Sequence, residues 1–143
     1  MAFEKFVQER VPGKGCAGGE PRISIHWSGG FGFLRDFWVR FPEKEVLIHT
    51  GLGNEPILTR QIFQSVTAYW DEKQRAIGFI FHEDWPEGSK KLSYSCCYPQ
   101  VVLPKFFEKY GLDSKQLAGR YPVHERKEGD QTMYYILLKE RET

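Results

Sequence analysis

The sequence has few cysteines, and none is placed for a disulfide framework or a common metal module. Only Cys16, Cys96 and Cys97 occur among 143 residues, so the number is odd and two are adjacent. Adjacent cysteines bridge only with strain, and no C-x-x-C spacing is present. A zinc site that combined them with His82 or His124 would have an uncommon spacing. The cysteines therefore predict a reduced, cytoplasmic protein, and no sequence motif points to a metal or other cofactor.

Long apolar runs and an excess of one charge are also lacking. The longest apolar stretches, near Phe79–Phe81 and Tyr134–Leu138, are much shorter than the roughly 20 residues of a membrane helix. Residues 1–10 are charged and have no apolar segment, so we expect no signal peptide and no membrane association. Twenty Lys and Arg against nineteen Asp and Glu give a net charge of +1. That balance excludes a polybasic arm and an acidic disordered tail, but it is compatible with a local basic face.

Aromatic residues and glycines are abundant. Eleven Phe, seven Tyr and four Trp make the chain 15% aromatic, which favours strands and excludes a coiled coil or a disordered protein. The length fits one domain with a core of its own. Residues 1–21 are rich in Gly and Pro from Val11 onward, which predicts a flexible lead-in before a domain at 22–139.

A first pattern of elements runs over residues 22–81. Alternation predicts a strand at 22–27, and a glycine turn leads to a second strand at 31–33. Apolar spacing then predicts a helix at 34–41, and residues 66–81 read as a hairpin. An insertion at about 43–63 separates that helix from the hairpin, with a strand at 46–48, a loop at 51–54 and a helical turn or two at 57–63.

The same plan returns over residues 90–139. We expect strands at 92–96 and 101–103, a helix that begins at Pro104 and is capped by Gly111, and a hairpin formed by 121–126 and 132–139. The chain is therefore predicted to be α+β, mostly β, with two β-β-α-β-β halves. Each half is too small to bury its aromatic residues alone, so we expect the halves to share one core.

Two motifs in this plan resemble a known family. Residues 101–112, VVLPKFFEKYGL, resemble the strand–Pro–Lys–helix–Gly–Leu signature of AbrB-like swapped-hairpin proteins. Residues 28–37, SGGFGFLRDF, resemble the same element without its proline. The resemblance implies a pseudo-duplicated swapped-hairpin barrel in the tandem, MraZ-type arrangement, with the insertion in the first half. From about residue 22, the chain also resembles small uncharacterised bacterial and phage proteins.

The resemblance implies DNA binding through basic residues of the barrel face and the lead-in. We therefore expect a non-enzymatic transcription regulator that binds double-stranded DNA, with affinity supplied mainly by phosphate contacts. Interspersed acids such as Glu20 and Asp36 favour the alternative of a solvated surface. The predicted nucleic-acid-binding residues are Arg10, Lys14, Arg22, Arg35, Arg40, Lys105 and Lys109.

The insertion supports a second hypothesis, a protein–protein interaction or inhibitor-like module of bacterial or phage origin. The inserted segment is more apolar than a surface loop usually is. It therefore either forms an exposed surface that binds a partner or a second copy of the chain, giving a homodimer, or folds back over one end of the barrel. The predicted partner-binding residues are Val46, Leu47, Ile57, Ile62 and Phe63, with Ile48 and Leu58 in the same segment.

An enzyme is the third hypothesis. A general base could come from the histidines, above all where His82, Glu83 and Asp84 end a strand, but no nucleophile motif accompanies them. We therefore expect no catalytic activity. One further set of residues could stack single-stranded bases but more often forms a core: Trp27, Phe31, Phe33, Phe37 and Trp38.

Overall fold

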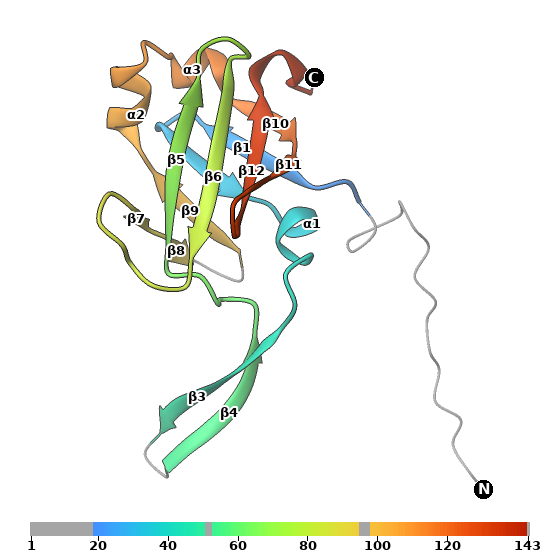
Figure 1. The fold of residues 1–143 in the computed structure, drawn as a ribbon, viewed down its shortest axis with the longest axis vertical. Helices are drawn as coiled ribbons and strands as arrows, with labels where there is room; N and C mark the ends of the chain where they lie inside the picture. The colour runs from blue at the N-terminus through green and yellow to red at the C-terminus, as the bar shows by residue number, and fades with distance from the viewer. Residues whose placement is uncertain (1–18, 51–52, 95–97, 143) are drawn as a thin grey trace, which may run out of the picture.

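Two five-stranded antiparallel sheets face each other and enclose the core (Figure 1). The computed structural model describes residues 19–50, 53–94 and 98–142. Strands make up 50% of the structure and helices 15%, which confirms a mostly β fold. A third, two-stranded sheet lies apart from the other two, and no sheet closes into a barrel within the described residues.

The first sheet combines strands from both halves of the chain. Its order is β10–β1–β2–β9–β8, with Phe31 of one half opposite Val101 of the other. The strands are β1 (Arg22–His26), β2 (Gly30–Phe33), β8 (Ser93–Tyr94), β9 (Pro99–Val102) and β10 (Gly119–Pro122).

The second sheet also combines the two halves. Its order is β11–β12–β6–β5–β7, and β6 pairs with β12 so that Ile77 lies opposite Ile136. The hairpin expected at 66–81 is present as β5 and β6, whose register runs from Ser65↔His82 to Asp71↔Ala76. The strands are β5 (Ser65–Asp71), β6 (Ala76–His82), β7 (Lys90–Lys91), β11 (His124–Glu128) and β12 (Gln131–Leu137).

Short helices follow the first strands of each half. The helix expected at 34–41 is present but shorter, as α1 (Arg35–Trp38). The helix expected after residue 104 is α2 (Pro104–Lys109), with its proline in the first turn, where the missing N–H costs nothing. Gly111 follows α2 with a φ of 65°, the left-handed conformation that glycine adopts easily. The remaining helices are α3 (Ser114–Leu117) and the 3-10 turn η1 (Leu138–Glu140).

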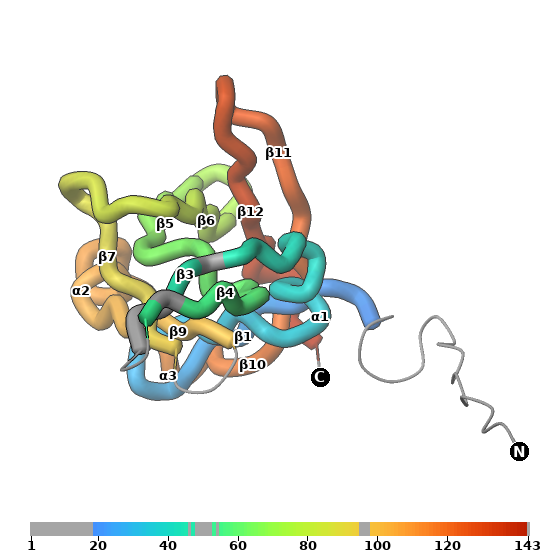
Figure 2. The backbone as a smooth tube through the Cα atoms, turned by 90° about the horizontal axis from the view of Figure 1, so that it is seen from below, coloured from blue at the N-terminus to red at the C-terminus, as the bar shows by residue number. Residues whose placement is uncertain are grey.

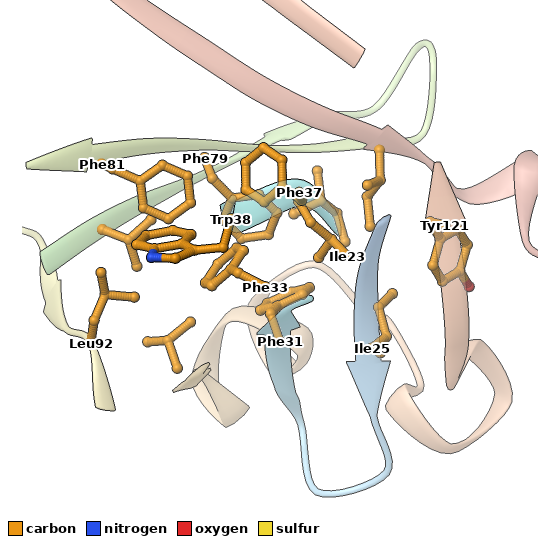
Figure 3. Close-up of a cluster of buried hydrophobic side chains, with 14 of the residues drawn as sticks. Ile23, Ile25, Phe31, Phe33, Phe37, Trp38, Phe79, Phe81, Leu92 and Tyr121 are labelled. Carbon is orange, nitrogen blue, oxygen red and sulfur yellow. The ribbon is translucent and has the colours of Figure 1, made fainter. Parts of the chain in front are cut away.

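Aromatic side chains fill the space between the two sheets (Figure 3). Phe31 and Phe33 of β2 contact Phe79 of β6 edge to face, with ring centroids 4.9 and 5.1 Å apart. Trp38 of α1 is fully buried and contacts Phe81, with centroids 5.2 Å apart. The core prediction therefore holds for four of the five aromatics considered, whereas Trp27 is 71% exposed.

The helical turn expected at 57–63 is wrong. Residues Gly53–Thr59 form strand β4, which pairs antiparallel with β3 (Lys44–Thr50) over seven residue pairs. The apolar spacing of Ile57, Leu58, Ile62 and Phe63 resembled a helix face, but the first two belong to this strand and the last two to the connection back to the body. The two strands project away from the sheets (Figure 1).

The single strand expected at 121–126 is also wrong, because the chain changes sheets there. Tyr121 lies in β10 and pairs with Ile23 of the first sheet. His124 begins β11 and pairs with Tyr135 of the second sheet. Val123 stands between the two strands, directly after Pro122, whose ring nitrogen has no hydrogen to donate to a ladder.

Candidate protein-interaction site

The β3–β4 hairpin, residues 44–59, forms an arm that exposes large aliphatic side chains. Leu47 and Leu58 are 66% and 67% exposed, and Ile57 is 40% exposed. Cross-strand pairing places Leu47 opposite Pro56 and Leu58 opposite Glu45. Because side chains alternate between the faces of a strand, Leu47 and Leu58 share one face of the arm. The described part of the body leaves both side chains on that face exposed.

Hydrogen bonds at its base fix the arm to the core. The indole Nε1 of Trp38 donates to the carbonyl oxygen of Arg60 at 2.8 Å, and Nε of Arg60 donates to the carbonyl oxygen of Phe41 at 3.1 Å. Arg60 also pairs with Glu43 at 2.9 Å. Since Trp38 is fully buried, these contacts join the residues that flank the arm to the core.

The predicted partner-binding residues divide between the arm and the body. Leu47 and Ile57 lie exposed on the arm, as the interaction hypothesis expects. Ile62 and Phe63 are half-buried, and the Phe63 ring lies 5.0 Å from that of Phe41. The side chain of Val46, like that of Ile48, is outside the described residues. Of the two arrangements foreseen for the insertion, the projecting one is found, because the described strands of the arm lie away from the sheets (Figure 1).

Arg22, a predicted DNA contact, is neutralised by acids. Its Nε lies 2.8 and 2.6 Å from the two carboxylate oxygens of Glu142, and Nη2 lies 3.7 Å from Glu20. The hydrogen bond to Glu142 raises the pKa of Arg22 above its ordinary value, with the charges of Glu20 and Asp36 acting in the same direction. This guanidinium joins β1 to the C-terminal segment.

The other predicted DNA contacts do not meet on one surface. Arg35 and Arg40 are exposed on or just after α1, and Lys105 and Lys109 are exposed on α2. The two helices lie on different sides of the body in both views (Figures 1 and 2). Arg10, Lys14 and most of the lead-in are outside the described residues, as are Cys16, Cys96 and Cys97.

The histidines have separate structural partners. His82 Nε2 lies 2.8 Å from Thr67 Oγ1, and the neighbouring Glu83 pairs with Lys44 at 2.7 Å. Burial lowers the pKa of His26, whose Nε2 lies 3.0 Å from Ser24 Oγ. His124 lies 2.6 Å from Glu140. The side chain of His49 is outside the described residues, and within the described parts of the chain no three His, Cys, Asp or Glu residues gather as metal ligands.

Sequence reasoning missed a shallow groove on the outer face of the second sheet. It has a volume of about 520 Å³ and is lined by residues that include Tyr69, Gly78 and Tyr135. These three residues are cross-strand neighbours, with Gly78 opposite both tyrosines. Met133 lies over the glycine, since a Cβ at Gly78 would be 2.6 Å from its Sδ. The sequence signal for this groove was Gly78 itself, because a glycine inside a strand often marks a place where another group approaches the backbone closely.

Comparison with known proteins adds no relative. The chain matches no protein-family model, no curated protein and no solved structure.

In the portion of the chain that the structure describes, no helix has the length and apolar character needed to cross a membrane.

Proposed function

We propose that this protein is a non-enzymatic interaction module that binds a protein partner through the arm. The observation that carries this proposal is the exposure of Leu47 and Leu58 on one face of a projecting hairpin. A fully buried leucine contributes roughly 1.5–3 kcal/mol relative to an exposed one, so a partner that covers this face gains substantial free energy. We infer that the protein acts in the cytoplasm, because its cysteines are not spaced as in a disulfide framework.

The construction of the arm supports the same function. An isolated two-stranded hairpin is at best marginally stable in water, and three or more strands or a packed face are normally needed. In the described structure the arm has only two strands and no packed face. Trp38 and Arg60 nevertheless hold its base in a defined position. A pre-positioned element loses less freedom on binding than a flexible loop would, which favours affinity.

Site-specific photo-crosslinking tests the proposal. A photoreactive phenylalanine derivative replaces Leu47 in the full-length chain, which is irradiated in its native cells. We expect discrete protein adducts whose yield falls, without vanishing, when Leu58→Ser removes one of the two leucines of this face. The matched control carries the derivative at Trp85, which is 59% exposed on the body. Absence of adducts at position 47, or the same adducts at both positions, would refute binding through the arm.

The strand order supports a pseudo-duplicated architecture of the swapped-hairpin type. Each half contributes its first strands, β1–β2 or β8–β9, to one sheet, and its last strands, β5–β6 or β11–β12, to the other. The halves meet at four antiparallel pairs, which are β2–β9 and β1–β10 in the first sheet and β6–β12 and β5–β7 in the second. We propose that the body is a duplicated β-β-α-β-β unit in an open, AbrB-like arrangement.

This architecture favours DNA binding as a second candidate function. The helices α1 and α2 stand at equivalent places in the two halves and expose Arg35, Arg40, Lys105 and Lys109. A protein that uses such cations must bind DNA more weakly as salt increases, because binding releases counterions. We expect Lys105→Ala with Lys109→Ala to reduce both affinity and salt dependence in a titration of double-stranded DNA at two salt concentrations. Arg22→Ala, which removes a cation already paired with Glu142, is the control. No binding at low salt would refute this candidate.

A further inference from the structure

We propose that the partner of the arm is a second copy of this chain, added antiparallel along the outer edge of β3. This inference rests on the proposed function of the arm and specifies its occupant. Within the described residues β3 pairs only with β4, so its other edge faces away from the hairpin. An edge of that kind is a template for another strand.

Pro56 determines which backbone groups face that edge. In an antiparallel pair, opposed residues alternate between exchanging hydrogen bonds with each other and directing N–H and C=O outward. Proline has no N–H, so Pro56 fits an outward position without loss to the hairpin. Leu47 lies opposite Pro56 and therefore also directs its backbone outward. Glu45 and His49, two residues away on either side, do the same.

The two edges of the arm are consequently unequal. The outer edge of β3 offers both donor and acceptor at Leu47, the middle residue of Lys44–Thr50. The outer edge of β4 lacks a donor at its centre, because Pro56 occupies the corresponding place. Proline on an edge strand is one of the devices by which proteins prevent strand addition. The arm is thus open along β3 and blocked along β4.

The sequence of β3 is complementary to itself about Leu47. A twofold axis there pairs the two Leu47 residues and sets Glu45 of each copy opposite His49 of the other. All seven residues of the strand are then paired. An axis at Glu45 or at His49 would instead oppose identical ionisable residues and shorten the overlap, and like charges opposite each other are destabilising. The central register is therefore the favoured one, and it is isologous, as homodimer interfaces with twofold symmetry are.

The resulting four-stranded sheet removes the weakness of the isolated hairpin. Its order would be β4–β3–β3–β4, which exceeds the minimum of three strands for independent stability. Leu47 and Leu58 share one face with Glu45 and Pro56, so pairing brings the leucines of the two copies into one apolar surface. Apolar side chains that lie opposite each other on neighbouring strands stabilise a sheet, so these leucines are expected to stabilise the dimer.

Two proline substitutions form a matched test. Leu47→Pro removes the outward N–H from the open edge, whereas Leu58→Pro removes one from the blocked edge, and the two side chains are equally exposed. In light scattering coupled to size exclusion, we expect the wild-type chain and Leu58→Pro at twice 16.7 kDa, and Leu47→Pro at 16.7 kDa. We expect the dissociation constant of Leu47→Pro to rise at least roughly 30-fold, the effect of about two lost hydrogen bonds. Unchanged circular dichroism checks that both variants fold.

A charge exchange tests the register independently of proline. Glu45→Lys places a cation opposite position 49 of the other copy and is expected to weaken the dimer. Adding His49→Glu to the same chain restores an opposite-charge pair and should recover the dimer. Recovery is specific to the register centred on Leu47, because other registers do not bring positions 45 and 49 together. Weakening without recovery would overturn this register.

The outcomes separate this inference from the proposed function. A monomeric wild-type chain at high micromolar concentration, or equal dissociation of both proline variants, would overturn the self-pairing. If crosslinks at position 47 then lead to a different protein, the arm remains an interaction site and only its occupant is wrong. If position 47 yields no adduct of any mass, both fail.

Discussion

Trp38 connects the core to the arm, so its replacement tests both. Its ring is fully buried, and its indole N–H donates to Arg60 at 2.8 Å. Trp38→Phe leaves a cavity and a carbonyl without its donor, and we expect the free energy of unfolding to fall by about 2–4 kcal/mol. Urea unfolding followed by circular dichroism measures the change. Trp27→Phe is the control, because Trp27 is 71% exposed and should change stability by less than about 0.5 kcal/mol. Equal effects at the two sites would contradict the structure.

Tyr94 predicts a loss of stability at alkaline pH. Its hydroxyl donates to the carbonyl oxygen of Phe63 at 2.7 Å, and burial raises its pKa to about 12. Because the folded pKa lies above the unfolded value of 10, the stabilisation is complete below pH 10 and is lost as the pH rises toward 12. Burial also raises the pKa values of Tyr121 and Tyr134, which act in the same direction.

Urea unfolding at pH 8, 10 and 11 measures this alkaline loss. We expect Tyr94→Phe to be less stable at pH 8, because its hydrogen bond is missing, but to lose less stability between pH 10 and pH 11 than the wild-type protein. Tyr110→Phe, at an exposed residue directly after α2, should retain the wild-type decrease. An identical decrease in all three proteins would show that Tyr94 does not titrate as the structure indicates.

The arm is expected to be dispensable for the body. A short Gly-Asn-Gly loop in place of residues 44–59 keeps Arg60, Glu43 and their contacts with Trp38 and Phe41. The replacement removes exposed leucines and one exposed ion pair, Lys44–Glu83. Exposed pairs contribute about 0–1 kcal/mol, so we expect unfolding free energies within about 1 kcal/mol of each other when both proteins are monomeric. A larger decrease would mean that the arm is part of the folding unit.

Elements with one buried face were predictable from the sequence, but only part of the arm was: the strand expected at 46–48 lies within β3, whereas β4 was expected to be a loop and a helical turn. Residues 66–81 alternate around a turn, and Pro104 and Gly111 mark the ends of a helix, so local chemistry determines both. The arm lacks a buried face, so the residues around Ile57 do not show the alternation of apolar and polar side chains that indicates a strand. Its strands are defined by pairing between residues up to 15 apart, from Lys44↔Thr59 inward.

The candidate site was predictable in composition but not in geometry. The apolar character of the insertion identified Leu47 and Ile57, which the structure exposes. Ile62 and Phe63 have the same character, but their contacts with the core could not be read from local sequence. Likewise, Arg22 reads as a free cation until the fold brings Glu142 to it from 120 residues away.

Charge distribution over the whole molecule favours a protein partner over DNA. The net charge of +1 comes from twenty basic and nineteen acidic residues, and some of the cations are paired locally, as in Arg22–Glu142, Lys44–Glu83 and Arg60–Glu43. These pairs use cations that a phosphate-binding surface would need to leave free. The arm, by contrast, presents aliphatic side chains, whose burial is largely insensitive to salt. Interaction through the arm is thus compatible with a neutral protein.

The interleaved strand order predicts that neither half of the chain folds alone. β2 pairs with β9 and β6 with β12, so each sheet is completed by strands from both halves. Separation would also divide the core, because Phe31 and Phe107, whose rings stack at 5.2 Å, belong to different halves. The loop at Gly88 is a suitable point of division, since a Cβ there would meet nothing within 4 Å.

Fragment complementation measures this dependence. The chain is divided into fragments 1–87 and 88–143, and each is purified separately. We expect each fragment alone to unfold without a cooperative transition and to lack near-ultraviolet circular dichroism, because its sheets and aromatic core are incomplete. Mixing should restore the near-ultraviolet signal and a cooperative urea transition at a one-to-one ratio. A cooperative transition in either isolated fragment would show that the halves are separate domains, and the shared core would then not be what couples them.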